Sequence, residues 1–106
     1  MPKYLVTGSY SLEGLKGVIK EGGSARMDAL KQLVEANGGT LEAAYFAFGP
    51  DDYVFICDLP DNVTAAALTV AAAATGTVSP KLTVLLTPEE VDAATKKVVS
   101  YRAPGQ

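Results

Sequence analysis

Histidine and tryptophan are absent from this chain, and cysteine occurs only once, at Cys57. Without histidine, the side chain that most often serves as general base and metal ligand is missing, and a haem enzyme with a histidine axial ligand is excluded. Cys57 falls in a predicted buried strand with no basic neighbour in sequence, which indicates an inert core residue. We therefore predict no metal site and no cofactor.

Basic residues are also few, with nine Lys and Arg against twelve Asp and Glu and a net charge of −3. A nucleic-acid binder needs clustered cations to neutralise phosphates, so no nucleic-acid partner is expected. The longest apolar stretch, around Ala65–Ala74, is too short and too rich in alanine to cross a bilayer, so no membrane association is expected. The first predicted strand follows Met1 with no signal peptide, and a lone cysteine suits a reducing compartment. A cytoplasmic protein is the expectation.

The 106 residues, 48% of them hydrophobic, suffice for one core, which predicts a single domain over residues 1–106. Short apolar or alternating runs predict strands at residues 3–9, 40–48, 52–59 and 78–86. Caps predict helices after Ser9 or Ser11, after Ser24, after Asp61 and after Thr87. The first two have apolar stripes at Leu12, Leu15 and Ile19 and at Met27, Leu30 and Val34. They form either one kinked crossover or two helices meeting at Glu21-Gly22-Gly23.

The resulting order, βαββαβ followed by a C-terminal helix, predicts an α+β protein with the ferredoxin-like arrangement. Its four-stranded sheet is antiparallel, with the first and third strands in the middle and both crossover helices on one face. Pro80 cannot donate to a strand ladder, so the fourth strand is expected at an edge. A tight turn at Gly49-Pro50-Asp51 is expected to join the second and third strands.

Both faces of this sheet are predicted to be apolar. Side chains alternate as Tyr53, Phe55 and Cys57 against Val54 and Ile56 in the third strand, and as Leu41, Ala43 and Tyr45 against Ala44 and Phe46 in the second. Two helices can cover only one face. If four or five apolar side chains stayed exposed to water, each would lose roughly 1.5–3 kcal/mol of burial free energy. The sum is comparable to the total stability of a small domain, about 5–15 kcal/mol.

The second face is therefore expected to be covered. The same face of another copy is the economical cover, so the chain is predicted to pair with itself as a homodimer, with a higher oligomer as the alternative. The competing interpretation is that the last helix and the tail fold back over this face.

Several segments resemble the GYD-domain family of small bacterial proteins. They run from Pro2-Lys3-Tyr4-Leu5 through Gly49-Pro50-Asp51-Asp52, Tyr53-Val54-Phe55-Ile56, Asp58-Leu59-Pro60-Asp61 and Gly76-Thr77-Val78 to Thr87-Pro88-Glu89-Glu90, nearly the whole chain. The Gly-x-Tyr-Asp signature of the family is matched at Gly49 and Asp52, but Asp51 stands at the tyrosine position. The resemblance implies a dimeric α/β-barrel type of ferredoxin-like fold, and it implies no particular reaction.

One candidate anion site lies at the predicted break between the first two helices. Gly22, Gly23 and Ser24 would supply backbone N–H groups and a hydroxyl for a carboxylate or phosphate, and Lys20 and Arg26 would add positive charge. The alternative is an ordinary helix break with surface charges, and the spacing is not that of a P-loop.

Other candidates are Asp52 and the tyrosines. Asp52 enters a central strand from a turn, so it either caps that turn or faces a pocket as a general base or polar anchor. Four tyrosines near the predicted strands, Tyr4, Tyr10, Tyr45 and Tyr53, could line a cavity between sheet and helices, with core packing as the alternative. Tyr10 and Tyr45 are kept as the candidates.

Three functional classes stay open at this point. The first is a homo-oligomeric protein that binds a small organic or anionic molecule in the cavity between sheet and helices. The second is a cofactor-free monooxygenase-like or isomerase-like enzyme that uses Tyr and Asp for proton transfer. The third is a non-catalytic regulatory module.

Overall fold

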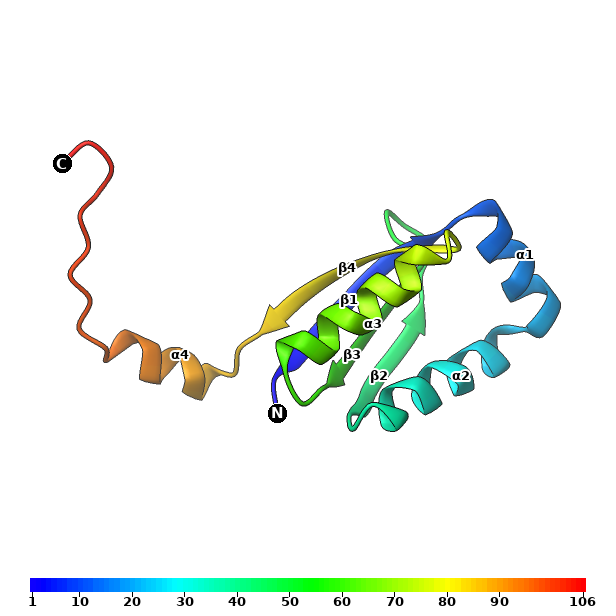
Figure 1. The fold of residues 1–106 in the computed structure, drawn as a ribbon, viewed down its shortest axis with the longest axis horizontal. Helices are drawn as coiled ribbons and strands as arrows, with labels where there is room; N and C mark the ends of the chain where they lie inside the picture. The colour runs from blue at the N-terminus through cyan, green and yellow to red at the C-terminus, as the bar shows by residue number, and fades with distance from the viewer.

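The computed structural model describes residues 1–106 and contains one four-stranded sheet and four helices (Figure 1). In chain order the elements are β1 (Lys3–Tyr10), α1 (Leu12–Glu21), α2 (Gly23–Ala36), β2 (Thr40–Phe46), β3 (Tyr53–Asp58), α3 (Asn62–Ala74), β4 (Val78–Leu85) and α4 (Pro88–Thr95). The strand order is β2-β3-β1-β4, and every neighbouring pair is antiparallel. The predicted α+β, ferredoxin-like arrangement is confirmed, with β1 and β3 in the middle and β4, which contains Pro80, at an edge.

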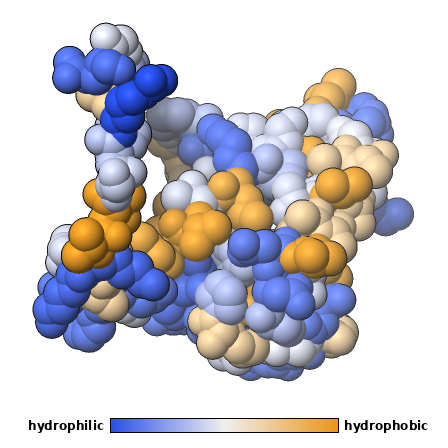
Figure 2. All heavy atoms as spheres, turned by 60° about the vertical axis from the view of Figure 1, so that its left-hand side comes forward, coloured by the Kyte–Doolittle hydropathy of each residue, from blue (hydrophilic) through white to orange (hydrophobic).

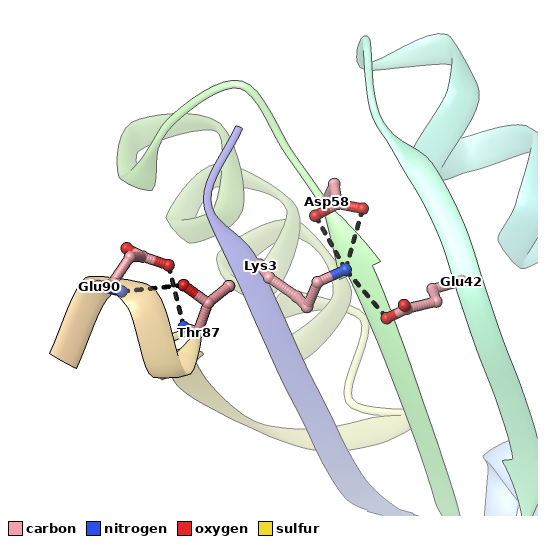
Figure 3. A network of polar contacts seen from close by, with 5 residues as sticks. All are labelled: Lys3, Glu42, Asp58, Thr87 and Glu90. Carbon is pink, nitrogen blue, oxygen red and sulfur yellow. Dashed lines mark hydrogen bonds and ion pairs between the residues drawn. The ribbon is translucent and has the colours of Figure 1, made fainter. Parts of the chain in front are cut away.

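Three helix starts follow the predicted caps, at Ser11, Asp61 and Thr87. The predicted cap at Ser24 is wrong, because α2 already begins at Gly23 and its N-cap residue, Gly22, has no side chain to accept a hydrogen bond. The Asp61 carboxylate accepts a hydrogen bond from the Thr64 amide at 2.8 Å at the start of α3. At the start of α4 the Thr87 hydroxyl accepts from the Glu90 amide, and the Glu90 carboxylate accepts from the Thr87 amide (Figure 3). Each bond satisfies an amide that the first helical turn leaves without a partner.

The hydrophobic core lies between the sheet and helices α2 and α3. It is built from Tyr4, Val34, Cys57, Leu59 and Ala65, each at most 2% exposed. The hydroxyl of Tyr4 donates a hydrogen bond to the side-chain oxygen of Asn62 in the first turn of α3, so this fully buried phenol has a partner. Tyr4 is thus a core residue that fastens β1 to α3.

The second strand departs from simple alternation. A bulge between Leu41 and Ala43 breaks its register against β3, so Leu41 pairs with Cys57 while Ala43 pairs with Ile56. As a result Leu41 packs against the core, and the prediction that Leu41 shares a face with Ala43 and Tyr45 is wrong. The extra residue of a bulge shifts every preceding side chain to the other face of the strand.

The connection between β2 and β3 is longer than predicted. β2 ends at Phe46, and residues 47–52 form the loop in place of a tight turn at Gly49-Pro50-Asp51. The loop is closed by a backbone hydrogen bond from the Ala47 amide to the Asp52 carbonyl at 2.9 Å. Lys81 Nζ of β4 lies 2.8 Å from Asp51 Oδ1. This ion pair ties the β2–β3 loop to β4, the strand on the other side of β1.

The sheet face opposite α2 and α3, here called the open face, has no helix over it. Leu5, Val54, Ile56 and Leu85 lie on it and are only half-buried, and Tyr45 is 68% exposed. The competing prediction, that the last helix and the tail cover this face, is wrong. Figure 1 shows α4 and the tail projecting beyond the end of β4, and residues 86–106 are all exposed.

One end of the open face is polar. Lys3 Nζ lies 3.0 Å from Glu42 Oε2 and 3.2 Å from Asp58 Oδ1, so the cluster joins the three strands β1, β2 and β3 (Figure 3). Hydrogen bonds to Glu42 and Asp58 raise the pKa of Lys3 above its ordinary value. The cluster forms a charged margin beside the apolar centre of the face.

Helix α1 leaves most of its apolar stripe uncovered. Leu12 and Ile19 are 67% and 83% exposed, so the stripe does not face the core. The helix is instead held at Gly14, which is buried against the backbone of Thr77. A side chain at Gly14 would collide with the Thr77 carbonyl, so α1 approaches the sheet through this one small residue.

None of the four helices is long and apolar enough to cross a membrane.

Candidate functional site

A cavity of about 100 Å³ lies between the sheet and helices α2 and α3. Its walls come from three strands, two helices and the residue after β3. The lining residues are Val6, Tyr10, Tyr53, Phe55, Cys57, Leu59, Val78, Pro80 and Leu82 from the sheet side, and Arg26, Met27, Leu30, Leu33, Val34, Ala65, Leu68, Thr69 and Ala72 from the helices. Fifteen of these eighteen residues are hydrophobic. Such a site is suited to the apolar body of a small organic molecule.

The join between α1 and α2 places Arg26 at the cavity. Gly22 has φ +87°, in the left-handed region that glycine adopts without strain, and it both ends α1 and precedes the first residue of α2. The turn directs α2 along the sheet, so that Met27, Leu30 and Val34 face the cavity as their spacing predicts. Arg26, one residue before this stripe, lies in the lining beside them.

Aromatic rings form one part of the wall. The ring centroids of Tyr10 and Tyr53 are 5.2 Å apart, and those of Tyr53 and Phe55 are 6.2 Å apart. The Tyr53 ring lies over Gly8 of β1, where a Cβ atom would collide with its hydroxyl group. Gly8 therefore creates the space that the Tyr53 phenol occupies.

Arg26 is the one charged residue in the lining. Its guanidinium lies 3.9 Å from the carboxylate of Glu21, at the outer limit of an ion pair, and both side chains are more than 40% exposed. Exposed pairs of this kind are worth about 0–1 kcal/mol, so Glu21 holds Arg26 only weakly. The guanidinium thus has donors left for an anionic group of a ligand.

The other titratable groups of the lining stay protonated at neutral pH. Burial raises the pKa of Tyr10, an effect that the nearby Arg26 guanidinium partly offsets. Burial also raises the pKa of Tyr53 to about 12 and that of the Cys57 thiol to about 11. Each of these groups carries a hydrogen-bond donor at pH 7, and none is a thiolate or phenolate.

Asp52 has a structural partner beside the cavity. Its Oδ2 accepts a hydrogen bond from the Tyr10 amide at 2.9 Å, and its own amide donates to the Gly8 carbonyl at 2.8 Å. These two bonds hold the start of β3 to the end of β1. The Asp52 carboxylate thus bonds to the end of β1 instead of to the backbone of its own turn, and the residue does not line the cavity.

The remaining candidates are spread over other surfaces. Gly23 and Ser24 border a separate shallow hollow with Met27, Asp28 and Phe46. Lys20 is exposed on α1, and Tyr45 is on the open face. Of the eight candidate residues, the structure brings only Tyr10 and Arg26 into the cavity.

Sequence reasoning considered Tyr53 as a cavity residue without keeping it as a candidate, and it did not consider Phe55 or Thr69. The alternation of β3 carried a signal for Tyr53 and Phe55, since both share the helix-covered face with Cys57. Thr69 carried none, because its place in the lining follows from how α3 crosses the sheet. Its hydroxyl donates to the Ala65 carbonyl at 2.8 Å within the helix. No group of three or more acidic or cysteine side chains is placed to hold a metal ion.

The fold and the cavity define a ferredoxin-like α+β protein with an apolar, helix-covered site that contains a single charged side chain. Residues 4–95 match the GYD domain family, so the chain belongs to that family. No curated protein and no solved structure matches the chain.

Proposed function

We propose that this protein binds a small organic anion in the cavity between the sheet and helices α2 and α3, and that it does so as a homodimer. The observation that carries the proposal is the lining itself: it is almost wholly apolar, and its one charged residue, Arg26, stands close to the phenols of Tyr10 and Tyr53. An apolar wall with a few convergent donors is the usual form of a small-molecule site.

The volume limits the ligand. A cavity of about 150 Å³ lined by apolar side chains holds benzene, and this one measures about 100 Å³. This cavity is smaller than one that holds benzene, so a short branched chain fits without side-chain movement, and a single ring fits with a small displacement of the lining side chains. A carboxylate on that body would meet the guanidinium of Arg26, whose planar donors match its two oxygens.

The protonation states support binding over proton transfer. Tyr10, Tyr53 and Cys57 keep their protons at pH 7, and the guanidinium of Arg26 adds its N–H groups, so the lining presents donors at neutral pH. A general base would have to come from outside the lining, and the carboxylate of Asp52 is already bonded to the Tyr10 amide. This arrangement favours holding an anion in one orientation.

Titration with benzoate tests the cavity, with benzamide as the neutral probe of nearly the same shape. We expect benzoate to shift the NMR signals of Tyr53, Leu30 and Leu68, and benzamide to bind more weakly. Arg26→Gln should reduce benzoate affinity about tenfold, the cost of losing a charged hydrogen bond. Lys20→Gln, which removes an exposed cation outside the cavity, should change it little.

Two results would refute this use of the cavity. One is that benzoate and benzamide leave the signals of the lining residues unmoved. The other is that Lys20→Gln weakens benzoate binding as much as Arg26→Gln, since binding would then depend on net charge and not on the cavity.

The homodimer is supported by the open face. Leu5, Val54, Ile56 and Leu85 form an apolar centre that no segment of the same chain covers. Complete burial of such side chains stabilises by roughly 1.5–3 kcal/mol each. A second open face packed against the first supplies that cover in a two-fold, sheet-on-sheet contact.

A further inference from the structure

The last twenty residues form an arm that leaves the body of the protein (Figure 1). The arm, residues 87–106, consists of α4 and the tail, and every one of its residues is exposed. It makes the molecule 55 Å long and gives it a radius of gyration of 16.9 Å, whereas a compact chain of this length has about 13 Å. In this conformation the arm gains almost no packing energy from its own chain.

The arm nevertheless has the sequence of a segment that packs. Its helix has a complete capping box and Pro88 in the first turn, and its exposed apolar residues are Val91, Val98, Val99 and Tyr101. An isolated helix shorter than about 12–15 residues is marginal in water, and α4 has eight. A helix this short needs a surface to pack against.

A second apolar surface without a partner lies at the other end of the molecule. The stripe of α1 exposes Leu12, Leu15 and Ile19, by 67%, 43% and 83%. Figure 1 shows α1 at one end of the long axis and the arm at the opposite end. Both surfaces therefore expose aliphatic side chains that their own chain leaves uncovered.

The hollow beside the arm is open to another molecule. Figure 2 shows hydrophobic residues at the base of the arm and across the facing part of the body, with an open space between them. The charge of the tail favours a copy of the same chain as the occupant. Residues 96–106, which include Val98, Val99 and Tyr101, carry three basic residues and no acid, the three acids of the arm lie in α4, and residues 1–86 carry nine acids and six bases.

Two-fold symmetry brings the two surfaces together. A two-fold axis perpendicular to the long axis reverses that axis, so the arm end of each copy meets the α1 end of the other. We propose that the arm of one copy packs its apolar side chains on the α1 stripe of a second copy, and that the second arm does the same in return. The proposal rests on the two-fold homodimer proposed above and adds an exchanged arm to it.

Mixed-label NMR tests this directly. One copy carries a nitroxide on Val98→Cys, and Cys57, being buried, is left unlabelled by the reagent. The other copy is enriched in ¹⁵N and carries no label. After mixing and re-equilibration, the nitroxide should broaden the amide signals of α1, from Leu12 to Ile19, in the enriched copy. Broadening confined to other surfaces, or none, would overturn the docking site.

Interface variants supply the second readout. Val98→Asp and Ile19→Asp should each raise the dimer dissociation constant about tenfold or more, as expected for losing one buried aliphatic contact. The double variant should weaken dimerisation by less than the sum of the two single effects, because both changes break the same contact. Ser100→Asp in the tail and Gly17→Asp in α1 are the matched controls on exposed positions of the same two segments, and they should leave dimerisation nearly unchanged.

The outcomes distinguish the contact made by the arm from the contact between the two open faces. If Val98→Asp and Ile19→Asp leave the dimer as tight as the parent while Ile56→Asp dissociates it, the exchanged arm is refuted and the sheet-on-sheet dimer stands. If the unaltered protein is monomeric at every concentration, both proposals fail.

Discussion

The carboxylate of Asp52 accepts the backbone hydrogen bond of Tyr10 at 2.9 Å, across 42 residues of sequence. Tyr10 is the last residue of β1, and no strand partner in β3 reaches its amide, because the β1–β3 pairing stops at Gly8 and Tyr53. Asp52 therefore replaces a missing strand partner with a side chain. The same bond sets where β1 ends, and with it the position of the Tyr10 ring in the cavity wall.

Replacing Asp52 by alanine should therefore destabilise the protein. The Tyr10 amide is partly buried and would lose its acceptor, which costs about 1–3 kcal/mol. Asp52→Asn is the matched control, because its amide oxygen still accepts a hydrogen bond and should recover most of the loss. Urea denaturation of the three proteins measures the difference. Equal midpoints for Asp52→Ala and the parent would show that this bond contributes nothing.

Gly8→Ala should be costly for a different reason. A Cβ atom at Gly8 would collide with the Tyr53 hydroxyl and with the Ser79 carbonyl of β4, and the backbone oxygen cannot move aside cheaply. Overpacking of this kind costs about 1–3 kcal/mol. Gly17→Ala, in an exposed turn of α1 with nothing within 4 Å, should instead stabilise by about 0.5–1 kcal/mol. Thermal unfolding that shifts in the same direction for both variants would contradict this.

Stability should fall in alkaline solution. Burial raises the pKa of Tyr53 from 10.0 to about 12 and that of Cys57 from 9.0 to about 11. The folded protein thus keeps these protons to higher pH than the unfolded chain does. The contribution of both groups is complete below about pH 9 and is lost as the pH rises towards about 12, since the unfolded chain deprotonates first.

Urea unfolding at a series of pH values from about 8 to about 12 measures this loss. In Cys57→Ala the decline between about pH 9 and about pH 11 should be shallower, because one of the two raised groups is gone. A free energy of unfolding that is constant over this range would contradict the assignment of Tyr53 and Cys57 as buried, protonated groups.

Much of the fold was predictable because local signals agreed with one another. The caps at Asp61 and Thr87, the Glu21-Gly22-Gly23 break and the edge position of Pro80 each follow from the chemistry of one or two residues. The apolar character of both sheet faces was likewise readable from the alternation of β3. These features depend on near neighbours in sequence.

The errors have physical causes of another kind. The bulge at Glu42 adds one residue to β2 without any proline or glycine to mark it, and it moved Leu41 to the opposite face. The stripe of α1 has regular spacing, yet its packing depends on Gly14 reaching Thr77, a contact between distant segments. An apolar stripe indicates that a surface will be covered, but not by which molecule.

The candidate site was also predictable only in part. Arg26 and Tyr10 were selected for their chemistry, and the fold brings both to the cavity. Lys20 and Tyr45 were chemically as suitable as Arg26 and Tyr10. However, Lys20 is exposed on α1, which turns away from the sheet, and the side chain of Tyr45 lies on the open face. Which side chains converge depends on long-range packing, which local spacing does not specify.

Sedimentation velocity of the full chain over a range of concentrations tests most directly whether the open face is shared between two copies. We predict a dimer that persists on dilution to low micromolar concentration, and a folded but largely monomeric Ile56→Asp variant, with Ala66→Asp on the exposed side of α3 as the dimeric control. A parent protein that sediments as a folded monomer throughout that range would contradict the prediction.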